Sequence, residues 1–141
     1  MTPAANPQPI AIVVCDNVYH DSFGKRALVG MFSEIVTTQT DGPVVHPKMV
    51  IYVAFTEVYP RCEVEILIED SESDRVICSL KTPPAPPEVN PTDIYEFEFE
   101  VMNLSFPSIG TYFIQFKANG TTMLQRPIKV RAIPNEQRDN K

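Results

Sequence analysis

The sequence predicts an all-β fold, a two-layer antiparallel β-sandwich of about eight strands. Three observations support this prediction. The 141 residues include 14 prolines and 5 glycines, which interrupt every run that would be long enough for a helix. Several of the remaining runs alternate apolar and polar residues with a period of two. Turn-forming residues recur about every ten positions, a spacing that is typical of sandwiches.

The first three predicted strands are mostly apolar. Residues 10–19 form a nearly continuous β-branched run, and residues 27–36 follow after the polar loop HDSFGKR, so the two runs predict a first hairpin. Gly30 lies inside the second run, where a missing side chain marks a bulge or a close approach of backbone. The tripeptide DGP at 41–43 predicts a turn, and residues 49–58 predict a central strand.

The middle of the chain predicts a hairpin followed by a crossover. Residues 62–69 alternate cleanly, and residues 75–80 return as their partner strand after the acidic turn DSESD. Residues 81–91 contain five prolines, which cannot donate to a ladder of hydrogen bonds. This segment is therefore predicted to cross from one sheet to the other in a polyproline-like conformation.

Three further strands complete the predicted sandwich. Residues 94–101 alternate most strictly, with aromatic side chains toward the core and glutamates toward solvent. Residues 110–118 and 122–133 are joined by Asn-Gly, a pair that suits the positive φ angles of a type I′ turn. Pro127 lacks an amide hydrogen, so the last strand is predicted to lie at an edge or to carry a bulge. The residues predicted to face the core are Tyr95, Phe97, Phe99, Val101, Tyr112, Ile114, Phe116, Ile128 and Val130.

Length and composition fit one globular domain. With 43% hydrophobic residues the chain can bury a single core, predicted at 10–133 between a flexible lead-in at 1–9 and a polar tail at 134–141. The net charge of −6 argues against nucleic acid as a partner. The start resembles no signal peptide and no apolar run spans a membrane, so we expect a cytoplasmic protein. The three cysteines are expected to be buried free thiols.

Two stretches resemble known families. Residues 104–122 resemble the final hairpin of immunoglobulin-like sandwiches, with Gly110 and Tyr112 where a glycine and a corner tyrosine introduce the penultimate strand. The chain has Ile114 in place of that family's cysteine and has no tryptophan, so the resemblance implies the broader immunoglobulin-like class. A second pattern is similar to a family of small uncharacterised bacterial all-β proteins, which implies no activity. It consists of Asp16, Gly24, Lys25, Leu28, Gly30, Phe32 and Pro47.

The loop of the first hairpin is the main candidate for a binding site. Its polar residues, with a histidine further on, could offer ligands to zinc or manganese or contact a small ligand: Asp16, His20, Asp21, Lys25 and His46. In an extended strand, however, residues i and i+4 lie about 13 Å apart, and Asp, Ser and Gly are what a hairpin turn needs. A structural turn is therefore the preferred interpretation, and no metal or other cofactor is predicted. The loop aspartates at 41, 70, 74 and 93 match no EF-hand spacing.

A row of glutamates is the most regular charged feature of the sequence. Glu96, Glu98 and Glu100 project from one face of a single predicted strand. Because carboxylates at this spacing repel one another, Lys or Arg neighbours are expected across the ladder, on a solvated face. The alternative is an acidic docking surface for a basic partner.

Catalytic motifs are missing from the sequence. There is no GxSxG elbow, the glycines are isolated, and the cysteines lie within predicted strands. We therefore predict a non-enzymatic interaction or accessory module that binds a protein partner or a second copy of itself, for example by strand addition at an exposed edge. The alternative is a metal- or ligand-binding sandwich that uses the loop from Asp16 to Lys25 with His46.

Overall fold

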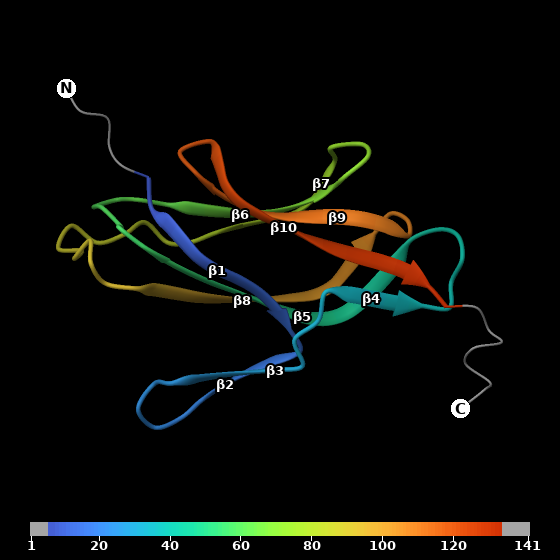
Figure 1. Ribbon diagram of the computed structural model, residues 1–141, viewed down its shortest axis with the longest axis horizontal. Helices are drawn as coiled ribbons and strands as arrows, with labels where there is room; N and C mark the ends of the chain where they lie inside the picture. The colour runs from blue at the N-terminus through green and yellow to red at the C-terminus, as the bar shows by residue number, and fades with distance from the viewer. Residues whose placement is uncertain (1–5, 134–141) are drawn as a thin grey trace.

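Two β-sheets face each other as the layers of a sandwich (Figure 1). The computed structural model describes residues 6–133. One sheet has three strands, in the order β1 (Gln8–Cys15), β5 (Val44–Thr56) and β8 (Tyr95–Phe106). The other has five, in the order β4 (Glu34–Thr37), β10 (Thr121–Ala132), β9 (Gly110–Ala118), β6 (Val64–Asp70) and β7 (Val76–Lys81). A separate hairpin consists of β2 (Asn17–His20) and β3 (Arg26–Val29).

The predicted fold class is confirmed, with ten strands in the described residues instead of about eight. The extra strands arise because both of the first two predicted strands are divided. The first divides at Asp16, whose amide donates to the carbonyls of Val29 and Gly30 at 3.1 Å each. The second divides at Gly30, whose φ of 73° is a left-handed conformation that a strand does not continue. Only β2 and β3 therefore form the first hairpin, and β1 pairs with β5.

One pairing departs from the predicted antiparallel arrangement. β4 runs parallel to the end of β10, with Glu34 opposite Lys129 and Thr37 opposite Ala132. β10 thus lies between β4 and β9, but β4 pairs only with Lys129–Ala132. At Pro127 the strand pairs with β9 alone, so the predicted edge is present at this residue, while the bulge of β10 lies elsewhere, between Thr122 and Leu124. Pro127 is tolerated because it precedes the residues that pair with β4, so its missing amide hydrogen removes nothing from that ladder.

The sandwich begins slightly earlier than the predicted boundary at residue 10. Gln8 and Pro9 already pair with Thr56 and Phe55. A bulge between Pro9 and Ala11 follows, which accommodates a residue that cannot donate a hydrogen bond. The predicted polar tail at 134–141 lies outside the described residues.

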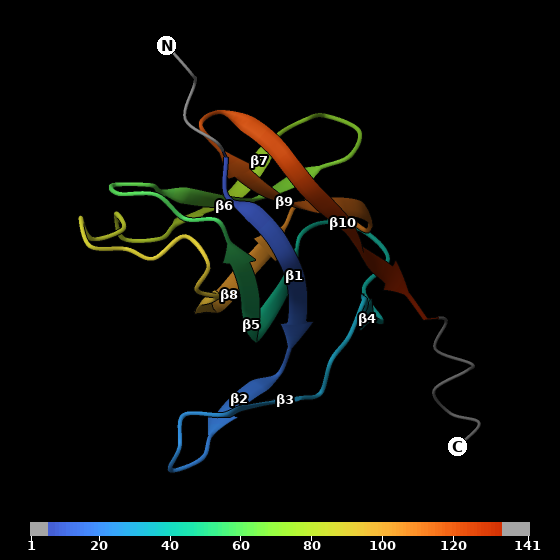
Figure 2. The same ribbon diagram turned by 60° about the vertical axis from the view of Figure 1, so that its left-hand side comes forward.

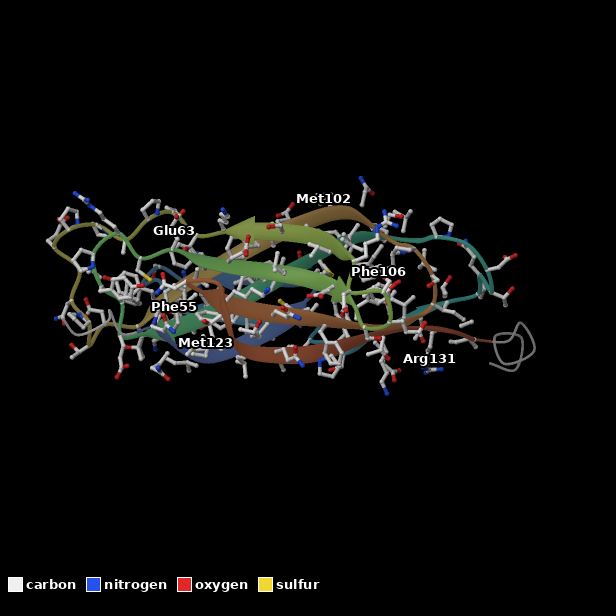
Figure 3. The ribbon with its side chains drawn as sticks, turned by 90° about the horizontal axis from the view of Figure 1, so that it is seen from above. Phe55, Glu63, Met102, Phe106, Met123 and Arg131 are labelled. Carbon is white, nitrogen blue, oxygen red and sulfur yellow. The ribbon has the colours of Figure 1, made fainter. Side chains whose placement is uncertain are left out.

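The core lies between the two sheets and follows the predicted alternation. On β9 and β10 the inward residues are buried, and Phe55 and Phe106 fill the core toward its two ends (Figure 3). The inward aromatic residues of β8 pack against this core but are only half-buried: Tyr95, Phe97 and Phe99. They remain partly exposed because β8 is the last strand of its sheet.

The proline-rich crossover joins β7 to β8 and changes sheets, as predicted. It forms no ladder, as predicted, but two backbone hydrogen bonds tie it to the loop before β6. Ala85 donates to the carbonyl of Cys62 and accepts from the amide of Arg61, both at 2.9 Å. The crossover forms no strand beside β8, so β8 has no neighbour on its outer side within the described residues.

Candidate functional site

The tip of the β2–β3 hairpin is a hydrogen-bonded turn, and Asp21 organises it. The Asp21 carboxylate accepts from the amides of Phe23 and Lys25, at 2.8 and 2.9 Å. The backbone closes the same turn, since the Asp21 amide donates to the Lys25 carbonyl and Gly24 donates to Asp21. A single oxygen of this carboxylate, Oδ1, accepts both hydrogen bonds, which matches the structural interpretation of the loop.

The hairpin leaves the main sandwich and lies over the outer face of the three-stranded sheet (Figure 2). Two of its side chains hold it there. Arg26 donates to Glu98 at 2.5 Å and to Glu96 at 2.9 Å, and the His20 ring nitrogen Nε2 lies 2.6 Å from the same Glu98 carboxylate. The expectation that the glutamates pair across the ladder is therefore wrong. Glu98 lies opposite Tyr52 and Glu96 opposite Ala54, so the cations come from the hairpin instead.

The pKa values of this cluster follow from its contacts. Burial raises the pKa of the Glu98 carboxyl, but the hydrogen bonds from Arg26 and His20 outweigh this effect and hold it below the usual value of a glutamate. Burial and a hydrogen bond to Glu96 raise the pKa of Tyr52 to about 12. Tyr52 therefore stays protonated, and its hydroxyl donates a hydrogen bond to the Glu96 carboxylate. The cluster is a clasp that fixes the hairpin on the sheet, and we call it the hairpin clasp: His20, Arg26, Tyr52, Glu96 and Glu98.

Acid is expected to release the hairpin clasp before it unfolds the sandwich. A carboxyl whose pKa is lowered in the folded state stabilises that state above its ordinary pKa, and this contribution disappears as the pH falls through the lowered value. Arg26 stays charged throughout, so protonation of Glu98 is the event that breaks its ion pairs with Arg26 and His20. In an NMR titration below about pH 4, amide signals of residues 17–29 should shift while those of β9 stay constant.

A Glu98→Gln variant is the control for this titration. It should show the released hairpin signals already at neutral pH and lose most of the acid step. Hairpin signals that stay constant down to the pH at which β9 unfolds would show that these ion pairs do not hold the hairpin.

His46 lies far from His20, the other histidine of the predicted hairpin site, whose ring contacts Glu98. It is on β5 opposite Leu104, six residues along β8 from Glu98, or about 20 Å of extended strand. Its ring packs against Phe32 at 5.5 Å between centroids, and its buried Nε2 has no partner in the described residues. Asp16 and Lys25 are exposed. Within residues 6–133, no group of three or more His, Cys, Asp or Glu side chains is placed to hold a metal. The structure thus does not bring this predicted set together.

Tyr112 lies in the corner that introduces β9. Its hydroxyl donates to the Ser108 carbonyl at 2.6 Å and accepts from the Ser108 amide at 3.2 Å. Its ring is buried and packs edge-on against Phe106, with centroids 4.9 Å apart. Gly110, at the start of the strand, has a φ of 150°, and an added Cβ there would meet nothing within 4 Å.

Replacing Tyr112 by phenylalanine is expected to lower the free energy of unfolding by about 1–3 kcal/mol. The ring still fills its site, but both Ser108 backbone groups lose their partner. Chemical denaturation measures the difference, and Tyr19→Phe is the matched control, because the Tyr19 side chain is exposed. Equal stability of the two variants would mean that water replaces the hydroxyl at no cost.

The open side of the sandwich, between β7 and β8, is the feature that the sequence did not reveal. Figure 3 shows these two strands next to each other, with Met102 at the border of the molecule. An apolar pocket of about 240 Å³ lies at one end of this side. Its walls come from aromatic side chains of β5 and β8, from the loop between β5 and β6, and from the crossover: Phe55, Val58, Cys62, Thr82, Pro83, Pro84, Ala85, Pro86, Tyr95 and Phe97. A second hollow of about 550 Å³ lies further along, beside Met102 and Ile77.

The free edge of β8 runs along this open side. β8 is twelve residues long and pairs with β5 alone in the described part of the chain. Alternate residues of such a strand direct their amide and carbonyl groups away from the sheet, where they are free to bind another strand. The edge of β7 is half as long and is flanked by Arg75 and Lys81, charges of the kind that protect edges from pairing. We call the free edge of β8 with the two hollows the β8 edge site.

Comparisons with known proteins place the chain in a family and leave its role open. The profile of a family of unknown function (DUF6941) matches residues 10–131. No curated protein matches. Among solved structures, an immunoglobulin-like protein from Pseudomonas aeruginosa is similar, at 11% identity and a TM-score of 0.36, over 92% of this chain and 100% of that one. Nowhere in residues 6–133 is there a helix with the length and hydropathy needed to cross a membrane.

Proposed function

The chain belongs to DUF6941, a family of unknown function, and we propose from its geometry that it is a non-enzymatic interaction module that binds an extended segment of a partner protein at the β8 edge site. The observation that carries this proposal is the unpaired edge of a twelve-residue strand beside two hollows. Main-chain hydrogen bonds to such an edge supply affinity, and pockets for alternate side chains supply specificity.

The edge is long enough for stable pairing. β8 keeps a constant register with β5 from Tyr95 to Met102, so it presents a regular row of backbone groups over these eight residues, up to Asn103, whose φ of 52° interrupts the extended conformation. Inside the sheet, Phe55, Phe97 and Phe99 form a stacked aromatic row, with ring centroids 5.9 and 6.4 Å apart. An added strand would cover the half-exposed Phe97 and Phe99 and bury apolar surface that is now in water.

The cysteines support a non-enzymatic role. Burial raises the pKa of the thiols of Cys15, Cys62 and Cys78, which disfavours the thiolate that a nucleophile requires. Cys62 lines the apolar pocket, yet its surroundings there are aromatic rings and prolines. Such a pocket suits an apolar side chain.

Blocking the backbone of β8 tests the proposal. Adjacent residues of a strand direct their amides to opposite sides, so of the variants Phe99→Pro and Glu100→Pro one removes an amide from the free edge and the other damages the ladder with β5. Thermal melting identifies the variant that remains folded, and Phe99→Ala controls for the lost ring.

Partners are then captured from an extract of the host on wild-type and edge-blocked protein, and each purified partner is studied by hydrogen–deuterium exchange. We expect slower exchange of β8 amides in the complex and at least tenfold weaker binding to the edge-blocked variant. Partners that bind both proteins equally, with unchanged exchange in β8, would contradict strand addition.

A further inference from the structure

We infer that the segment bound at the β8 edge site alternates basic and apolar residues. This inference rests on the proposed function and goes beyond it by assigning the chemistry of the partner. A strand that pairs with β8 must place its side chains alternately beside the two faces of β8, because successive residues of a strand point to opposite sides. The side chains of β8 on each face therefore select what the partner carries.

The outer face of β8 carries negative charge. Glu96, Glu98 and Glu100 project from it at alternate positions. Arg26 pairs with Glu96 and Glu98, and His20 adds a second contact to Glu98. Lys48 lies on the same face opposite Met102, but its ammonium donates to Asn17 and not to a glutamate. Glu100 is exposed and has no ion pair among the described residues. Lysine or arginine side chains on the added strand would lie directly beside this row, about 5 Å away between Cβ atoms.

The inner face of β8 is aromatic. Tyr95, Phe97 and Phe99 are half-buried there, and the apolar pocket opens next to the first two. Aliphatic or aromatic side chains on an added strand would continue this row, and one of them could fill the pocket of about 240 Å³. A polar side chain on this face would lose its hydration without gaining a partner.

The same charges disfavour a second copy of this chain as the occupant. Two β8 strands that pair antiparallel about a centre near Glu98 would set glutamates directly opposite glutamates on the outer face. Like charges in cross-strand pairs are destabilising. A different chain with basic residues at alternate positions avoids this repulsion and neutralises the charge of Glu100.

Synthetic peptides provide the test. The probe is a nine-residue peptide of alternating Lys and Val with blocked ends, used at concentrations at which it is monomeric alone. Two matched peptides carry Thr or Glu at the lysine positions, and a fourth is the lysine peptide with N-methyl groups on the amides of one edge. Binding to the full-length protein is measured by fluorescence anisotropy at low and moderate salt.

The lysine peptide should bind about tenfold more tightly than the threonine peptide, and the glutamate peptide more weakly still. Its advantage should shrink with added salt and in a Glu100→Gln variant, for which Glu57→Gln, exposed and outside β8, is the control. Equal binding of the lysine and threonine peptides would overturn the inferred chemistry and leave strand addition intact. Equal binding of the lysine peptide and its N-methylated form would instead overturn strand addition, because charge alone would then hold the peptide.

Discussion

Replacing Phe55 by alanine is expected to lower the free energy of unfolding by about 3–5 kcal/mol, the range for a buried phenylalanine. Phe55 is 3% exposed and contacts Phe116 edge-on at 5.4 Å and Phe97 in a stack at 5.9 Å. Its ring also forms a wall of the apolar pocket. The variant therefore loses buried apolar surface and leaves a void that joins a space already open to solvent. Urea denaturation followed by circular dichroism measures the change.

The same substitution at Phe23 is the control for this experiment. Phe23 lies at the tip of the hairpin and is 89% exposed, so Phe23→Ala should change the free energy of unfolding by no more than about 0.5 kcal/mol. Similar losses for the two variants would contradict the position assigned to Phe55 in the core. If the neighbouring rings collapse into the void, the loss at Phe55 falls toward the lower end of the range.

Replacing Gly30 by alanine is expected to destabilise the protein by more than the same change at Gly24. Both glycines have positive φ, 73° and 83°, so a side chain at either position costs about 1–3 kcal/mol of backbone strain. At Gly24 an added Cβ meets nothing within 4 Å. At Gly30 it would overlap with Oδ2 of Asp16 and lie 2.9 Å from Cγ, closer than real Cβ atoms approach, and its distance of 3.1 Å from Cβ would be a tight contact. The difference between the two variants isolates the cost of this overlap.

A double variant distinguishes the overlap from other causes. Adding Asp16→Ala to Gly30→Ala removes the Cγ contact and should restore part of the stability, whereas Asp16→Ala alone should have a small effect because that side chain is exposed. Additive effects of the two changes would mean that the side chains do not meet. Denaturation of the four proteins in parallel supplies the coupling energy.

Several local features were predictable from residue order alone. The clean alternation in 62–69 and the acidic turn that leads to 75–80 predicted the β6–β7 hairpin, which forms with the expected antiparallel pairing. The Asn119-Gly120 pair predicted a turn with two positive φ angles, and the structure has 52° and 77° there. A bulge or close approach at Gly30 was predicted from its place in an apolar run. The structure shows that the Asp16 side chain leaves no room for a Cβ at this position. Each of these features depends on residues close together in the chain.

The candidate site was only partly predictable. The glutamate row on β8 was recognised, but its partners were expected across the ladder, and Arg26 and His20 come from a hairpin about 70 residues earlier. The predicted hairpin site with His46 is not assembled, because β5 carries His46 well along β8 from the hairpin clasp. No local signal marks the open side, since it results from the absence of a strand beside β8.

The amino-acid sequence by itself determined the all-β class, the turns and the face of each strand, because side-chain period and turn chemistry act between residues a few positions apart. The tertiary structure alone decided that β4 runs parallel to β10, that the hairpin lies on the acidic face, and that β8 is left as an edge. These outcomes depend on which surfaces and charges meet after distant segments are brought together. The order of residues along the chain does not specify such long-range contacts locally. The β8 edge site is one outcome of this kind.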